Sequence, residues 1–207
     1  MLTSAFFGTV KTSLFAGALK QSHVDGMNAL SAAWDKDGDG DIRKLAYVLA
    51  TAYHETARTM QPVIETRQPN EAANPSVDVA IARLENAWKR GRMRWVKQPY
   101  WRKDANGFSW LGRGYPQVTH YDNYLKAEKL TGIKFTKNPS LMLVAENAAL
   151  VTVVMMMGGD FTGVGLGHYF TDKASDPLGA RHIINGSESD AKVAGYYKPF
   201  LLALSAK

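Results

Sequence analysis

The stretch KLAYVLATAYHETARTMQPVIETR, residues 44–67, decides the fold. Along its first half an apolar residue recurs every three or four positions, which is the spacing of one face of a helix. The residues on that face are Leu45, Val48, Leu49, Ala52 and Tyr53. Asp41 suits the N-cap of this helix, and Pro62 cannot continue it, so we expect an extended segment beyond. Glu55 then lies in the last turns of a helix and Glu65 on the extended segment.

The composition indicates one globular domain. The chain has 207 residues, of which 45% are hydrophobic, and it contains no repeat, low-complexity tract or linker. We therefore expect a single domain over residues 1–207, mainly α-helical with a small extended lobe. The absence of cysteine excludes disulfides and thiolate metal sites. The net charge of +6 favours an anionic partner, which could be nucleic acid, an acidic membrane surface or the acidic polymers of a bacterial envelope.

The remaining helices are expected from similar patterns. The N-terminal stretch looks like a secretion signal, but Lys11 and its two polar neighbours interrupt its apolar core, so we interpret it as a packed helix. No run reaches the roughly 20 apolar residues of a membrane-spanning helix. Further helices are predicted within residues 21–34, 74–91 and 138–160, after the glycine turn that precedes residue 120, and as two short helices near the C-terminus separated by Asn185 and Gly186.

Two segments resemble metal sites without completing them. His54 and Glu55 begin like a zinc-protease helix, but Arg58 stands where the second histidine belongs. The segment DKDGDGDIR matches the front half of a calcium loop through Asp35, Asp37, Asp39 and Asp41, and Ala46 replaces the glutamate that usually completes it. The sequence therefore favours a solvated turn that caps the next helix, with a weak calcium site as the alternative.

A basic and aromatic segment runs from Arg83 to Lys103. It contains eight Lys or Arg residues and one acidic residue, interleaved with Trp88, Trp95, Tyr100 and Trp101. Such a segment can grip single-stranded nucleic acid by stacking and phosphate contacts, and aromatic faces also stack on sugar rings. A third interpretation is a solvated helix face whose tryptophans belong to the core.

The stretch WLGRGYPQVTHYDNY, residues 110–124, follows this segment. Gly112 and Gly114 allow a tight backbone turn, after which short polar side chains follow at regular spacing. They are Gln117, Thr119, Asn123 and Tyr124. Hydroxyl and amide groups near a pair of carboxylates suit sugar recognition and water positioning.

Three of these segments together carry a resemblance. AYHETA, GRGYPQVTHYDNY and RHIING occur in this order over about residues 45–187. In this they resemble glycoside hydrolase family 19 of the lysozyme-like superfamily, which contains chitinases and phage endolysins. Val118 and Pro116 depart from the family pattern. The resemblance implies a lysozyme-like α+β fold with a large helical lobe and a small extended or β lobe.

The resemblance also implies roles for individual residues. Glu55 would be the general acid, Thr119 would hold the attacking water, and Glu65 would be the second carboxylate. The sugar cleft would be lined by His54, Trp110, Arg113, Gln117, Asn123, Tyr124 and Asn185. No cofactor is implied. For Glu65, an ion pair with Arg67 or Arg113 is the alternative.

The chemistry of glycoside cleavage agrees with two carboxyl groups. One carboxyl must protonate the leaving oxygen, while a carboxylate about 6.5–9.5 Å away activates water if the anomeric configuration inverts. We therefore expect an endolysin-type peptidoglycan hydrolase, with chitin as the alternative substrate. A nucleic-acid-binding protein and an inactive glycan-binding relative are the alternatives from other classes. We expect a monomer that binds peptidoglycan strands or chitin, binds no nucleic acid and does not insert stably into membranes. It would be made in the cytoplasm without a signal peptide and reach the periplasmic wall with the help of a holin.

Overall fold

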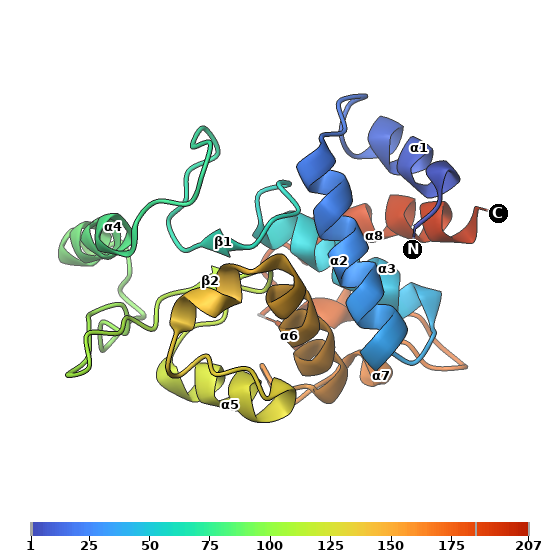
Figure 1. Ribbon diagram of the computed structural model, residues 1–207. Coiled ribbons are helices and arrows are strands. Elements are labelled where there is room, and N and C mark those ends of the chain that lie inside the picture. The colour runs from blue at the N-terminus through green and yellow to red at the C-terminus, as the bar shows by residue number, and fades with distance from the viewer. Residues whose placement is uncertain (1, 185, 207) are drawn as a thin grey trace.

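The protein is mainly α-helical, as the sequence predicts. The computed structural model describes residues 2–184 and 186–206. Its elements, labelled in Figure 1, follow in the order α1 Ser4–Ser13, α2 Gln21–Asp37, α3 Ile42–Glu55, β1 Val63–Ile64, α4 Val77–Lys89, β2 Arg113–Gly114, α5 Tyr121–Thr131, η1 Pro139–Leu143, α6 Ala145–Gly158, α7 Leu166–Tyr169, η2 Gly179–Ile183 and α8 Asp190–Ser205. The two strands pair antiparallel, with Val63 opposite Gly114 and Ile64 opposite Arg113.

Helix α3 is the centre of the core. The five apolar residues predicted for one face are buried, and so is every other residue from Lys44 to Tyr53, because α8 and α2 pack against this helix. Helix α6 packs against α2, and α1 covers α8 (Figure 1). The helix therefore places its C-terminal residue, Glu55, at the edge of a rigid core.

Helix α3 ends earlier than the position of Pro62 requires. Its last residue is Glu55, and Thr56 follows as the C-cap. Ala57 and Arg58 then take left-handed backbone angles, with φ of 49° and 70°, which stop the helix before the proline is reached. The strand β1 begins directly after Pro62, so the predicted extended segment is present but short.

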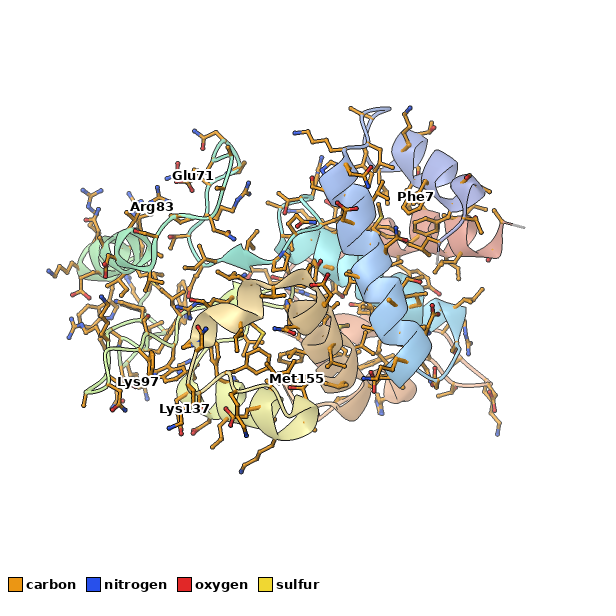
Figure 2. The ribbon with its side chains drawn as sticks, viewed as in Figure 1. Phe7, Glu71, Arg83, Lys97, Lys137 and Met155 are labelled. Carbon is orange, nitrogen blue, oxygen red and sulfur yellow. The ribbon has the colours of Figure 1, made fainter. Side chains whose placement is uncertain are left out.

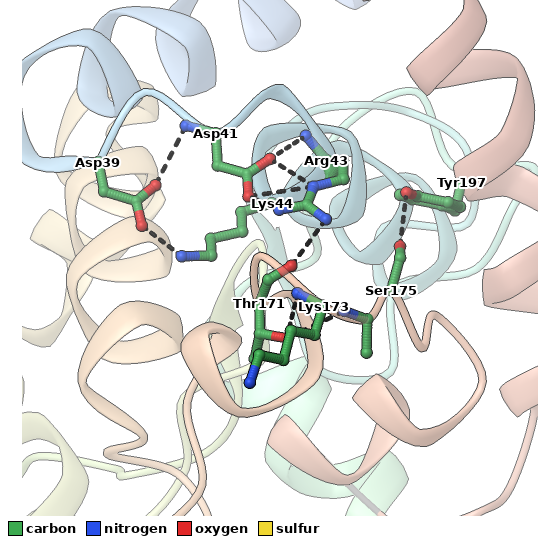
Figure 3. Close-up of polar contacts among 9 residues, drawn as sticks. Asp39, Asp41, Arg43, Lys44, Thr171, Lys173, Ser175 and Tyr197 are labelled. Atoms are coloured by element: carbon green, nitrogen blue, oxygen red, sulfur yellow. Dashed lines mark hydrogen bonds and ion pairs between the residues drawn. The ribbon is translucent and has the colours of Figure 1, made fainter.

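Only part of the aspartate-rich segment forms the expected turn. Helix α2 continues to Asp37, so Asp35 and Asp37 are helical, which corrects the assignment of residues 35–41 to one open loop. Asp41 is the N-cap of α3, as predicted, and accepts a hydrogen bond from the Arg43 backbone N–H at 2.9 Å. Figure 3 shows how its carboxylate also pairs with the Arg43 guanidinium.

Asp39 is also engaged within the protein. Its carboxylate forms an ion pair with Lys44 and accepts the Asp41 backbone N–H at 3.2 Å (Figure 3). Cationic side chains therefore neutralise the two aspartates that remain outside α2. Throughout residues 2–184 and 186–206, no group of three or more His, Asp or Glu side chains could hold a metal ion.

The predicted terminal helices are both present, but the C-terminal one is longer than expected. Phe6 and Val10 of α1 are buried, which agrees with a packed N-terminal helix. Near the C-terminus the sequence predicts two short helices, whereas the second, α8, has 16 residues and contains Pro199. Its packing against α3 and α1 stabilises it despite the missing N–H. No helix in the described part of the chain has the length and apolar character to cross a membrane.

A smaller lobe lies to one side of the core (Figure 1). It consists of α4 with the loops before and after it, and it is joined to the remainder through β1 and β2. Glu71 and Arg83, labelled in Figure 2, form an ion pair at 2.6 Å that fixes the loop before α4 to the helix. Within this lobe, Leu84 of α4 and Trp101 pack with Ile64 of β1 in an apolar cluster separate from the main core.

Candidate active site

Glu55 lies at the C-terminal end of α3, where its carboxylate is held by a distant arginine. The Nη1 atom of Arg181, in η2, donates to Oε1 of Glu55 at 2.6 Å. The side chain of Arg181 is 5% exposed and that of Glu55 is 18% exposed. Arg181 also donates from Nε to the backbone carbonyl of Glu188 at 3.0 Å. The ion pair thus fixes the orientation of a carboxylate that retains limited access to solvent.

Glu65 follows strand β1 and is held by neutral donors. Oε1 accepts a hydrogen bond from the Tyr100 hydroxyl at 2.7 Å, and Oε2 accepts the backbone N–H of Gly112 at 2.8 Å. Burial, and next the charge of Glu65, raise the pKa of Tyr100, so this hydroxyl keeps its proton and remains a donor. The two candidate carboxylates therefore have different surroundings.

Glu65 does not form the ion pair with Arg67 or Arg113 that was the alternative to a catalytic role. Arg67 donates to the backbone carbonyl of Glu71 at 2.6 Å. Arg113 is buried and donates to the Ser109 and Leu111 carbonyls. Within the described ranges, no ion pair involves Glu65.

Gly112 lets the backbone lie close to two side chains of the site. A Cβ atom there would lie 2.8 Å from Oε1 of Gln117 and 3.3 Å from Oε2 of Glu65. The backbone of the β2 segment can therefore approach both side chains. Gln117 itself donates from Nε2 to the Val63 carbonyl at 2.8 Å, which ties the turn to β1.

A small cavity brings Glu55 and Gln117 together. Its volume is about 110 Å³, and its walls come from the end of α3, from β1 and from the turn after β2. The lining residues are Glu55, Thr56, Ala57, Val63, Ile64, Thr66, Arg67 and Gln117. The end of helix α3 and strand β1 thus both line one cavity.

Thr119 lines a different and larger cavity of about 1080 Å³. Residues of the basic aromatic segment form one side, and the start of α5 forms the other. The lining residues are Trp95, Val96, Lys97, Gln98, Pro99, Tyr100, Trp110, Thr119, His120, Tyr121 and Asp122. Trp95 is 76% exposed, while Trp101 of the same segment is fully buried. Lys97 lies on the loop that follows α4 (Figure 2). Tyr100 links this cavity to Glu65, because it lines the wall and donates to the Glu65 carboxylate.

Tyr124 and Arg113 support the turn from behind, which corrects their assignment to the sugar cleft. Both side chains are buried. The Tyr124 hydroxyl donates to the Leu111 carbonyl at 2.8 Å and accepts from Nη1 of Arg113 at 2.9 Å. Their polar groups are therefore directed to the interior. Asn123 donates to the Thr119 carbonyl at 2.9 Å, so it too stabilises the local backbone.

Trp110 and His54 lie at the margins of the site. Trp110 is almost fully buried, and its Nε1 donates to Asp104 at 3.0 Å. His54 lines a third cavity, of about 320 Å³, together with Tyr53 of α3 and Tyr196 of α8. Burial lowers the pKa of His54, with an opposing effect from Glu55. Asn185 lies outside the described residues.

Two residues of this site were not assigned a role from the sequence. Arg181 belongs to the quoted RHIING segment, but no local pattern reveals that it pairs with a residue 126 positions away. Tyr100 is one aromatic among several in the basic segment, and only the fold selects it as the partner of Glu65. A comparison with protein-family models gives no match, and neither does a comparison with curated protein sequences.

Proposed function

We propose that this protein is a lysozyme-like glycoside hydrolase that cleaves the β-1,4 bonds of peptidoglycan by inverting acid/base catalysis. The observation that carries the proposal is the pair of carboxylates in unlike surroundings. Glu55 is beside a guanidinium at the end of α3, and Glu65 is held by a hydroxyl and a backbone N–H after β1. Different surroundings allow one carboxyl to act as acid and the other as base.

In this mechanism Glu55 protonates the leaving oxygen and Glu65 activates water. Thr119 holds that water at the edge of the large cavity. Tyr100 supports this division, because it lines the cavity together with Thr119 and binds the Glu65 carboxylate. Water attacks from the face opposite the leaving group, which inverts the anomeric configuration.

The large cavity supplies room for the glycan strand. Sugar rings stack on exposed aromatic faces, and Trp95 offers such a face at the cavity wall. The charge of +6 suits a polyanionic cell wall. A large helical body beside a smaller lobe of α4 and its loops is compatible with the lysozyme-like part of the proposal (Figure 1). The protein would act on the periplasmic wall after release from the cytoplasm.

The experiment is product analysis on two polymers. Purified sacculi and chitin oligomers are incubated with the protein, and the products are identified by mass spectrometry. Proton NMR of early products then gives the anomeric configuration. Muropeptides with newly formed reducing ends, released first as the α-anomer, are expected. Products from chitin alone would favour a chitinase, and no products from either polymer would refute the hydrolase.

A second candidate is a nucleic-acid-binding protein. It is favoured by the exposed side chain of Trp95 among the exposed Arg92, Arg94 and Lys97. Such a surface would bind single strands with an affinity that falls steeply with salt. Salt-dependent oligonucleotide binding without any loss of turbidity of permeabilised Gram-negative cells would favour this candidate over the hydrolase.

A further inference from the structure

Two buried hydroxyl groups lie on the same side of α3 as Glu55. Tyr47, Thr51 and Glu55 are spaced four residues apart, so their side chains are successive neighbours along the helix. Tyr47 and Thr51 are each 1% exposed. Neither hydroxyl oxygen has a hydrogen-bond partner within residues 2–184 and 186–206. Burying a polar group without a hydrogen-bond partner is unfavourable, so an unpaired arrangement needs an explanation.

Several other buried hydroxyls in this protein find partners within the fold. Thr56 and Thr152 donate to the carbonyls four residues earlier in their helices, at 2.7 and 2.6 Å. Tyr53 donates to the Leu14 carbonyl at 2.5 Å, and Tyr124 donates to the Leu111 carbonyl at 2.8 Å. Thr51 makes no such bond to the carbonyl of Tyr47, although it stands at the required spacing. Its hydroxyl thus remains without a partner among the described residues.

The surroundings of Tyr47 connect it to the Glu55–Arg181 pair. Its ring contacts those of Phe170 and Tyr197, at centroid distances of 5.5 and 6.3 Å. Burial is the largest effect and raises the pKa of its hydroxyl; the charge of Arg181 lowers this pKa, and the ionisable groups that raise it further are Glu55, Tyr169 and Asp176. Tyr47 therefore stays protonated and can donate a hydrogen bond, and the charges of Glu55 and Arg181 both act on its hydroxyl.

The carboxylate of Glu55 can use such donors. An ionised carboxylate has about four acceptor positions, and Arg181 approaches one of its oxygens. Buried polar groups that are not satisfied by the protein are commonly joined by an ordered water with about three hydrogen bonds. We propose that Tyr47 and Thr51 hold a buried water behind Glu55, and that this water donates to the Glu55 carboxylate.

Tyr47 is then a positioning residue for the proposed acid. This step rests on the proposed function. When Glu55 gives its proton to the leaving oxygen it becomes an anion, and the chain from Tyr47 through the water stabilises that charge as it forms. Without the hydroxyl the charged form of Glu55 is less favourable. His54 responds to the charges of Glu55 and Arg181 and also to those of Lys192 and Glu188, and all of these groups are present in the wild type and the variants alike.

The test uses Tyr47→Phe and Thr51→Val, which remove one hydroxyl each at nearly constant volume. Tyr115→Phe is the matched control. Its hydroxyl is also buried and without a partner in the described residues, but the charge that acts on it is Glu146 and not the Glu55–Arg181 pair. All three variants are first checked for folding by circular dichroism and thermal melting.

Two readouts separate the inference from the proposed function. The first is the titration of the Glu55 carboxyl carbon by NMR, assigned with Glu55→Gln. The midpoint should move to higher pH in Tyr47→Phe by up to about one unit and should not move in Tyr115→Phe. The second is hydrolysis of sacculi, in which Tyr47→Phe should lower kcat about tenfold with KM unchanged. The high-pH limit of activity should move upward.

The outcomes are distinct. A shifted Glu55 midpoint in a protein that hydrolyses nothing would support the buried water and refute the proposed function. An unshifted midpoint in both Tyr47→Phe and Thr51→Val would overturn the inference, even if the protein is a hydrolase. Should Tyr47→Phe fail to fold, Thr51→Val decides by the same midpoint. Equal shifts in Tyr47→Phe and Tyr115→Phe would also overturn it.

Discussion

Replacing Arg181 by alanine removes the partner that holds Glu55. The two side chains are 5% and 18% exposed and are joined at 2.6 Å, so the ion pair is largely shielded from water. Leaving one member of such a pair behind typically costs about 3–5 kcal/mol. Because Glu55 keeps some access to solvent, we expect the lower end, about 3 kcal/mol, with part of this due to the lost bond to the Glu188 carbonyl.

The control is Arg102→Ala. Arg102 also pairs with a glutamate, Glu85, at a similar distance of 2.7 Å, but its side chain is 52% exposed. Solvent screens that pair, so Arg102→Ala should lower the free energy of unfolding much less than Arg181→Ala does. Urea denaturation followed by circular dichroism at neutral pH measures both variants. In a Glu55→Gln background, Arg181→Ala should lower the free energy of unfolding by less than it does in the wild type. Equal losses for Arg181→Ala and Arg102→Ala would refute the argument from burial.

Two further predictions concern stability. Burial, and next the charge of Lys20, lower the pKa of His23, whose neutral Nδ1 accepts the Lys20 backbone N–H at 3.2 Å. The stabilisation that comes from neutral His23 is present above the ordinary histidine pKa of 6.5 and is lost as the pH falls below it. The urea midpoint should therefore decrease as the pH is lowered from about 7.5 to 5.5, and it should decrease less in His23→Gln. Gly26→Ala should destabilise by about 2 kcal/mol or more, because its Cβ would lie 1.6 Å from the Met60 carbonyl oxygen. Gly8→Ala in α1 meets nothing within 4 Å and should stabilise by about 0.5–1 kcal/mol, and the same sign for both alanine variants in thermal melts would contradict this reasoning.

Local patterns predicted the elements that depend on local physics. The apolar spacing within α3 defines a helix whether or not its partners are known, and the Asp41 cap fixes its start. The end of α3 was less predictable. Pro62 marks a position that the helix cannot pass, but Ala57 and Arg58 stop it sooner through backbone angles that their residue types do not favour.

The candidate site depends on contacts between distant segments, which no periodicity encodes. The sequence selects Glu55 and Glu65 as candidates, but their different surroundings come from Arg181 and Tyr100. Regular spacing also suggested that Tyr124 faces a ligand along with its polar neighbours. In the fold its ring enters the apolar cluster around Trp110, so its hydroxyl satisfies buried groups.

The spacing of the aspartates alone could not distinguish a calcium site from a turn that caps the next helix. The calcium-loop pattern places Asp35 and Asp37 at the first and third positions of a loop, whereas α2 continues through both residues. Helical continuation depends on the packing of Met27, Leu30 and other residues of α2 in the core, which the aspartates themselves do not reveal.

The most direct test of the account is the hydrolysis of sacculi by Glu55→Gln. This change removes the proposed acid at almost constant volume, and Glu146→Gln, an exposed glutamate in the first turn of α6, is the matched control. Turbidity loss and reducing-end release are measured with equal amounts of folded protein. The account predicts a decrease of about 10²–10⁴-fold for Glu55→Gln and wild-type activity for Glu146→Gln. Activity of Glu55→Gln within a few-fold of an active wild type would contradict it.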